Sequence, residues 1–161
     1  MTMQSDVNSE HMSATGVAVN YRTRLKGAVI SANTTATTRN VIFANNSTQT
    51  GTYNIPGSTT CTVTITAHGL TTGDRVWLDF TTGTGPDNVY SVTVTGDNTF
   101  TVTTTSLTTS GNVTMYKAIL MEVDAYNPTA FSVNVPGQGI VAKDGIYVAL
   151  PSSVTATVFY G

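Results

Sequence analysis

The sequence has few charged residues and no strong excess of either sign. Only 10% of its 161 residues are Asp, Glu, Lys or Arg, whereas about 25% is typical of soluble domains. The net charge is −2, which argues against a surface that follows the phosphates of a nucleic acid. No apolar run approaches the roughly 18 residues of a membrane-spanning segment. We therefore expect neither a nucleic-acid nor a membrane partner.

Cysteine is almost absent as well. The single cysteine, Cys61, excludes a disulfide within the chain. It stands at the start of an alternating segment and has no basic residue beside it in the sequence. We therefore interpret it as a small core residue rather than a nucleophile. Stability must then come from burial of apolar surface or from oligomerisation.

Recognisable catalytic patterns are also missing. The sequence contains no G-x-S-x-G, no H-E-x-x-H, no phosphate-binding loop and no EF-hand pattern. His68 lies between two predicted strands without a second ligand at metal-binding spacing, so we expect it to hydrogen-bond the backbone of its own turn. The sequence therefore predicts a protein that is not an enzyme, with no cofactor and no metal site.

The acidic residues are dispersed along the chain. Four of them lie in or near expected turns, where Asp caps the local backbone: Asp74, Asp79, Asp87 and Asp97. Glu122 and Asp124 share one face of an expected strand. They are either solvated or available to a cation or to an arginine of a neighbour.

Threonine is abundant, with 33 copies. Thr is β-branched and fits a pleated, half-buried surface. A surface with many hydroxyls and few charges is poorly protected against association. The composition therefore indicates either a Thr-rich β-domain or a subunit that neighbouring subunits cover, and the resemblance described below favours the second.

Apolar and polar residues alternate along most of the chain. Examples are C-T-V-T-I-T-A, R-V-W-L-D-F, V-Y-S-V-T-V-T and F-T-V-T-T-T, with a G-D-N-T turn between the last two. Strands of about 5–7 residues at spacings of about 8–12 predict an all-β fold, a β-sandwich or jelly-roll-like domain without substantial helix. Pro56-Gly57 is expected to end a strand, and Asp144-Gly145 to form the turn of a hairpin.

The only cluster of cations lies near the N-terminus. Alternation places Arg22, Arg24 and Lys26 on one face of a strand, with Tyr21 beside them. One interpretation is a solvated strand face. The other is a subunit interface that meets acidic groups.

Two aromatic residues and His68 suggest a second surface. Trp77 and Tyr90 lie on neighbouring expected strands, where their rings are able to stack on a sugar. With His68 they form a candidate exposed recognition face. The alternative is that these aromatic residues belong to the core or to an interface.

Two sequence patterns resemble structural proteins of tailed-bacteriophage virions. A-H-G-L-T-T-G-D-R-V, followed by V-Y-S-V-T-V-T-G-D-N-T-F-T-V, is similar to a small all-β module of tail-fibre and head-associated proteins. V-P-G-Q-G-I, K-D-G-I-Y-V-A-L and V-T-A-T-V-F-Y-G are similar to the C-terminal half of small phage β-sandwich proteins. The first pattern covers about a third of the chain.

The resemblance implies a three-part organisation. A polar N-terminal arm would occupy residues 1–16, a β-sandwich residues 17–57 plus 115–161, and an inserted antiparallel β-module residues 58–114. Insertions of this kind are tolerated at loop ends. If the arm is ordered, a neighbouring subunit is the natural candidate to hold it.

The resemblance also implies a function. It indicates a non-enzymatic structural subunit of a phage particle, in the first place a capsid decoration or cement protein that stabilises the head lattice. The expected partners are the major capsid protein or other virion subunits, and the expected state is a homo-oligomer, with a trimer favoured. Such a protein is located in the virion, after assembly in the cytoplasm of the bacterial host. The alternatives are a tail, collar or fibre component, or a receptor- or glycan-binding module.

Overall fold

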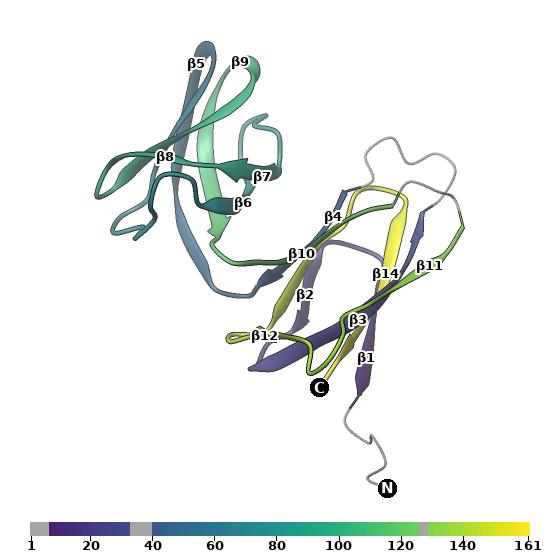
Figure 1. Cartoon of the computed structure of the whole chain (residues 1–161). Helices are drawn as coiled ribbons and strands as arrows, with labels where there is room; N and C mark the ends of the chain where they lie inside the picture. Colours follow the sequence, from purple (N-terminus) through teal and green to yellow (C-terminus); the bar gives the residue numbers. More distant parts are fainter. Residues whose placement is uncertain (1–6, 33–39, 126–128) are drawn as a thin grey trace, which may run out of the picture. The chain divides into compact units, whose positions relative to one another are not determined.

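The computed structural model describes residues 7–32, 40–125 and 129–161, and all regular elements in them are β-strands (Figure 1). The all-β prediction is therefore confirmed. The chain divides into two compact units: unit 1 comprises Met1–Asn46 and Ile119–Gly161, and unit 2 comprises Ser47–Ala118. The described part contains no helix that could cross a membrane.

Unit 1 is built from two antiparallel sheets. In the five-stranded sheet, β14 lies between β1 and β3, and the far edge of β3 pairs with both β11 and β12. Its strands are β1 (Asn8–Met12), β3 (Thr23–Ala32), β11 (Phe131–Asn134), β12 (Ile140–Ala142) and β14 (Val154–Tyr160). The other sheet has the order β10 (Ile119–Asp124), β4 (Asn40–Asn45), β13 (Ile146–Ala149) and β2 (Gly16–Val19).

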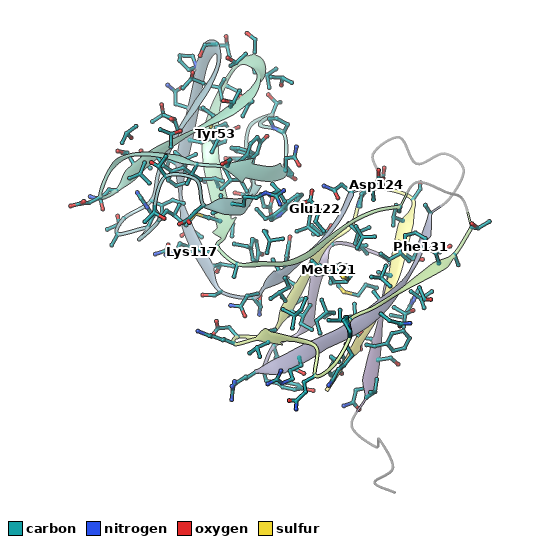
Figure 2. All side chains as sticks on the ribbon, viewed as in Figure 1. Tyr53, Lys117, Met121, Glu122, Asp124 and Phe131 are labelled. Carbon is teal, nitrogen blue, oxygen red and sulfur yellow. The ribbon has the colours of Figure 1, made fainter. Side chains whose placement is uncertain are left out.

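The two sheets of unit 1 share one apolar core. Leu25 and Val158 come from the first sheet, Phe43 and Ile146 from the second, and all four side chains are fully buried. Met121, labelled on β10 in Figure 2, packs against this core at its edge. Two sheets that enclose a common core form a β-sandwich, as the strand pattern predicted.

Unit 2 is a single antiparallel sheet dominated by two long strands. Strands β5 and β9 pair along their whole length, and the other edge of β9 pairs with β6 and β8. The elements are β5 (Thr48–Thr64), β6 (Arg75–Asp79), β7 (Asn88–Ser91), β8 (Thr93–Gly96) and β9 (Thr99–Tyr116). Asp97 and Asn98 form the expected tight turn between β8 and β9.

The core of unit 2 follows the alternation of the sequence. Val76, Leu78 and Phe80 are buried on one side of β6, as their spacing predicts. Cys61 is fully buried in the same core, opposite Val102 of β9. The interpretation of Cys61 as a small core residue is therefore confirmed.

The expected strand end at Pro56-Gly57 is wrong. Strand β5 continues through both residues, and its pairing with β9 shifts register between Pro56 and Ser58 and again before Thr60. Gly57 has a positive φ of 75°, which glycine adopts without strain. The pair therefore forms a β-bulge, the interior position at which a strand tolerates proline.

The unit boundaries differ from the residue limits that the sequence suggested. The junctions fall after Asn46 and after Ala118, rather than after residues 57 and 114. The reason is that β5 and β9 are paired from Thr48 and Tyr116 onward, so the first ten residues of β5 belong to unit 2. The apolar stretch after Met115 is accordingly split between the end of β9 and β10.

The N-terminal segment differs from the expected polar arm. Residues 8–12 form β1, which pairs with β14 in the register Asn8↔Tyr160 to Met12↔Ala156. The main chain of β14 thereby gains hydrogen-bond partners on its second edge. The chain's own strand β14 therefore holds this segment, for which the sequence had suggested a neighbouring subunit. Residues 1–6 lie outside the described part.

The expected hairpin at Asp144-Gly145 is also wrong. Strand β12 pairs with β3, whereas β13 pairs with β4 and β2, so this turn carries the chain from one sheet to the other. Asn45 Nδ2 donates to Asp144 Oδ2 at 2.7 Å, and the Asp144 N–H donates to Asn45 Oδ1 at 3.0 Å. These two long-range hydrogen bonds hold the turn against β4.

Candidate functional site

A hollow lies at one end of the five-stranded sheet of unit 1 and contains most of the predicted cation cluster. It has a volume of about 630 Å³ and is lined by Asn8, Tyr21, Arg22, Thr23, Arg24, Val141, Tyr160 and Gly161. Cross-strand pairing assembles it, because Asn8 is opposite Tyr160 and Val141 is opposite Arg24. We call it the Tyr21–Tyr160 hollow.

Two tyrosines form the aromatic part of this hollow. Tyr21 is 55% exposed, an unusual value for a large aromatic residue of a folded domain. Its ring meets that of Tyr160 edge to face, with 6.4 Å between the ring centroids. Desolvation, then a hydrogen bond to Tyr21 and the charges of Tyr21 and Glu10, raise the pKa of Tyr160. The phenol of Tyr160 therefore stays a neutral donor at physiological pH.

Two of the cations lie on β3 and the third directly before it. Arg22 is exposed, and Arg24 and Lys26 are half-buried, while Thr23 and Leu25 between them are buried. Arg24 and Lys26 therefore share one face of β3, whereas Arg22 lies in the bend before the strand and not on the predicted strand face. Arg24 Nη1 donates to the Gly139 carbonyl at 3.5 Å, and Lys26 Nζ donates to the Gln138 carbonyl at 3.0 Å.

The four predicted interface residues thus meet at one end of the sandwich. Tyr21, Arg22 and Arg24 line the hollow. Lys26 lies two residues after Arg24 on β3, outside the hollow. Their role in a subunit interface stays a prediction. Sequence reasoning missed Tyr160, because only the pairing of β14 with β1 and β3 brings it beside Tyr21.

The second predicted surface does not form an exposed face. His68 is only 1% exposed, and Tyr90 is buried as well, with its phenol donating to the Pro86 carbonyl at 2.6 Å. Trp77 is half-buried and occupies the opposite side of β6 from Val76, which is the cross-strand partner of Tyr90. The expectation of a recognition face from His68, Trp77 and Tyr90 is therefore corrected. Alternation sends Trp77 and Tyr90 to different sides of the sheet, and His68 lies in the loop between β5 and β6.

His68 instead organises a turn. The Leu70 N–H donates to Nδ1 at 3.0 Å, and Nε2 lies 3.0 Å from the Gly96 carbonyl. Because Nδ1 accepts a hydrogen bond, the ring proton is on Nε2, which donates to Gly96. The Phe100 ring packs edge to face on the imidazole, with 5.3 Å between the centroids. The prediction of a backbone hydrogen bond within its own turn is confirmed.

The acids act mainly on local backbone. Asp74 accepts a hydrogen bond from the Thr71 N–H at 2.8 Å, and Asp87 accepts one from the Phe80 N–H at 2.7 Å. Desolvation and the nearby charge of Asp87 raise the pKa of Asp79.

Glu122 and Asp124 lie on β10 (Figure 2), where Glu122 Oε1 accepts a hydrogen bond from the Asn40 amide at 2.6 Å. Within the described residues, no three His, Cys, Asp or Glu side chains are grouped as metal ligands.

Comparisons with known proteins give little further information. No family model matches the chain, and no curated protein matches it. Among solved structures, the chain is similar to the phage phi92 endosialidase, at 20% sequence identity and a TM-score of 0.34. The match covers 83% of this chain and 21% of that chain, so this chain spans about a fifth of the length of that protein. A likeness of this size carries no argument about function.

Proposed function

We propose that this protein is a non-enzymatic structural subunit of a phage particle, and specifically a decoration or cement protein of the head. Unit 1 attaches the protein to the shell, and the Tyr21–Tyr160 hollow is part of its contact surface. The observation that carries the proposal is the exposed pairing of aromatic and cationic side chains at this hollow. Tyrosine and arginine are enriched among the residues that dominate protein–protein interfaces.

The composition supports attachment rather than catalysis. The few acidic side chains are dispersed, and several are used to cap backbone within unit 2. The outward positions of β5 and β9 carry threonines instead of charges, for example at the cross-strand pair Thr62 and Thr101. Such surfaces favour association with neighbours over solvation.

A decoration protein acts by mass action. A subunit that binds the assembled lattice, but not the dissociated capsid proteins, shifts the equilibrium toward the assembled shell. Many copies add their contributions, so a modest affinity at each contact is sufficient. A trimer is the favoured state, because three linked copies raise the effective concentration at each lattice site.

Particles of the source phage provide the direct test. Heads and tails are separated and stripped of this chain, and each fraction is incubated with recombinant protein and sedimented. We expect saturable binding to heads, and a higher disruption temperature of the refilled shells. Light scattering on the free protein is expected to give three times the 16.9 kDa of one chain.

Other outcomes of this experiment are equally informative. Binding to tails alone would replace the head assignment by a tail, collar or fibre role. Binding to neither fraction would overturn the structural role. Arg22→Glu/Arg24→Glu is expected to lose binding to heads, while Lys143→Glu, which reverses an exposed cation outside the hollow, is expected to retain it.

A further inference from the structure

The three cations beside the hollow have a regular spacing. Arg24 and Lys26 occupy alternate positions of β3, so their side chains leave the same face of this strand. Arg22 precedes the strand in a bend, and with Arg24 it lines the hollow. Positions two apart in a β-strand are separated by roughly 6.7 Å. Side chains on one face of an extended partner segment recur at the same distance. A row of cations on a strand therefore matches a row of carboxylates at every second residue of such a segment.

Two of these cations are already held in place. The carbonyls of Gln138 and Gly139 accept hydrogen bonds from Lys26 and Arg24, and each bond uses a single donor. Guanidinium has five N–H donors and ammonium has three, so most donors remain available to a ligand. The cost of ordering these long side chains is thus partly met before binding.

Among the described residues, no acidic side chain lies in the hollow beside this row. In the described ranges, none of Arg22, Arg24 and Lys26 forms an ion pair with an acid. The residues that line the hollow include no Asp or Glu. Glu10 is close enough to influence Tyr160, but it does not line the hollow. The chain as a whole has a charge of −2, so this cationic row is a local exception.

We propose that the Tyr21–Tyr160 hollow and its cationic row bind an extended acidic segment of another virion protein, with carboxylates at alternate positions. This inference rests on the proposed function, which makes that partner a neighbouring subunit of the particle. Arg22 and Arg24 pair with successive carboxylates, an arrangement for which the planar guanidinium is well suited. The exposed ring of Tyr21 packs against the apolar atoms of the segment, while its hydroxyl remains hydrated.

An acidic peptide serves as the probe. Acetyl-Glu-Thr-Glu-Thr-Glu-amide is titrated into the full-length labelled protein and followed by amide chemical shifts, and fluorescence anisotropy of a tagged peptide gives the affinity. We expect shifts concentrated at residues 21–26 and 139–141. Affinity is expected to fall at least about tenfold in Arg22→Ala/Arg24→Ala, and to fall with added salt because the charges are solvent-accessible.

Matched controls separate specific pairing from general attraction. Lys143→Ala removes an exposed cation outside the hollow and is expected to bind the peptide like the wild type. Arg22→Lys/Arg24→Lys keeps the charge but removes the bidentate geometry, so an intermediate affinity is expected. Melting curves of all variants check that the fold is retained.

Four results would overturn this inference. The first is equal binding of the neutral peptide acetyl-Gln-Thr-Gln-Thr-Gln-amide. The second is unchanged affinity in Arg22→Ala/Arg24→Ala. The third is tighter binding of trigalacturonate than of the acidic peptide, which would assign the hollow to an acidic sugar. The fourth is equal binding of Arg22→Glu/Arg24→Glu and the wild type to particles. This result would also remove the hollow from the contact surface, but it would leave the role of the protein as a subunit of the particle.

Discussion

His68 shows how a residue with catalytic chemistry is used here for structure. The same imidazole that is a general base in many enzymes is buried, donates to Gly96 and accepts from Leu70. Its ring also packs against Phe100. Both ring nitrogens are therefore engaged by the fold, and no lone pair is directed to solvent.

We expect His68→Ala to destabilise unit 2 by about 2–4 kcal/mol. The substitution leaves a cavity beside Phe100 and removes the partners of a buried N–H and a buried carbonyl. Urea unfolding followed by amide resonances of unit 2 measures the loss. His11→Ala is the control, because His11 is exposed on β1 and bonds only Thr157; it should cost less than about 0.5 kcal/mol. Equal effects of the two substitutions would contradict the structural role of His68.

Two weakly acidic groups of unit 2, the Cys61 thiol and the Tyr90 phenol, make its stability decrease at alkaline pH. Burial raises the pKa of the Cys61 thiol from 9.0 to about 11. Burial, and then the charges of Cys61 and Asp87, raise that of Tyr90 from 10.0 to about 12. A folded-state pKa above the unfolded value means that the folded state binds the proton more tightly. This stabilisation is fully present below the unfolded pKa and is lost as pH rises through the folded pKa.

We therefore expect the free energy of unfolding of unit 2 to fall between pH 9 and pH 12. In Cys61→Ala the decrease should be smaller between pH 9 and pH 11, because the contribution of the Cys61 thiol is then absent. Urea unfolding at a series of pH values measures both curves. Parallel curves for the two proteins across that window would show that the Cys61 thiol is not held protonated by the fold.

At the scale of the elements, connections depend on a few glycines and polar pairs. The turn between β12 and β13 leaves one sheet and enters the other, and Gly145 has a φ of 105° there. A Cβ at Gly145 would collide with the carbonyl of Val19. Gly137 also has a positive φ, 67°, but a Cβ there would meet no atom within 4 Å.

These two glycines provide a matched pair for a stability measurement. Gly137→Ala should cost about 1–2 kcal/mol, because only the left-handed backbone conformation is penalised. Gly145→Ala should cost at least about 1 kcal/mol more, because the backbone of β2 must also move. Thermal or urea unfolding of unit 1 measures the difference. Similar costs for both would mean that β2 yields easily at this turn.

At the scale of the whole molecule, two cores divide the chain. The core of unit 1 draws on both ends of the sequence, and the core of unit 2 lies within one continuous segment. The segment starts and ends on paired strands, since Thr48 is opposite Tyr116 in unit 2. In unit 1, Ala44 is opposite Ile119. In each unit, therefore, the two points where the chain crosses to the other unit lie on neighbouring paired strands.

This arrangement predicts that unit 1 folds without unit 2. When Gly-Gly replaces residues 47–118, a three-residue loop of Asn46 and the two glycines joins β4 to β10, a length common in hairpins. We expect the amide spectrum of this variant to retain the dispersed resonances of unit 1. Residues 47–118 alone are expected to retain those of unit 2. Loss of dispersion in unit 1 would show that its core depends on the inserted unit.

The sequence by itself determined the class of fold and much of the burial. Alternation along β6 and β3 placed Val76, Leu78 and Leu25 inside, because the side chains of a strand point to opposite faces in turn. The isolation of Cys61 and His68 from other reactive residues predicted their structural use. The cation row was also visible, since its spacing is local.

Only the tertiary structure decided what depends on pairing between distant segments. Three features depend on partner strands that the local sequence does not identify. They are the strand through Pro56-Gly57, the turn between the sheets at Asp144-Gly145 and the pairing of β1 with β14. The same holds for Tyr160, which contacts Tyr21 because β14, near the end of the sequence, pairs with β3, near its beginning. Local residues set which face a side chain takes, whereas strand order and register set which side chains meet.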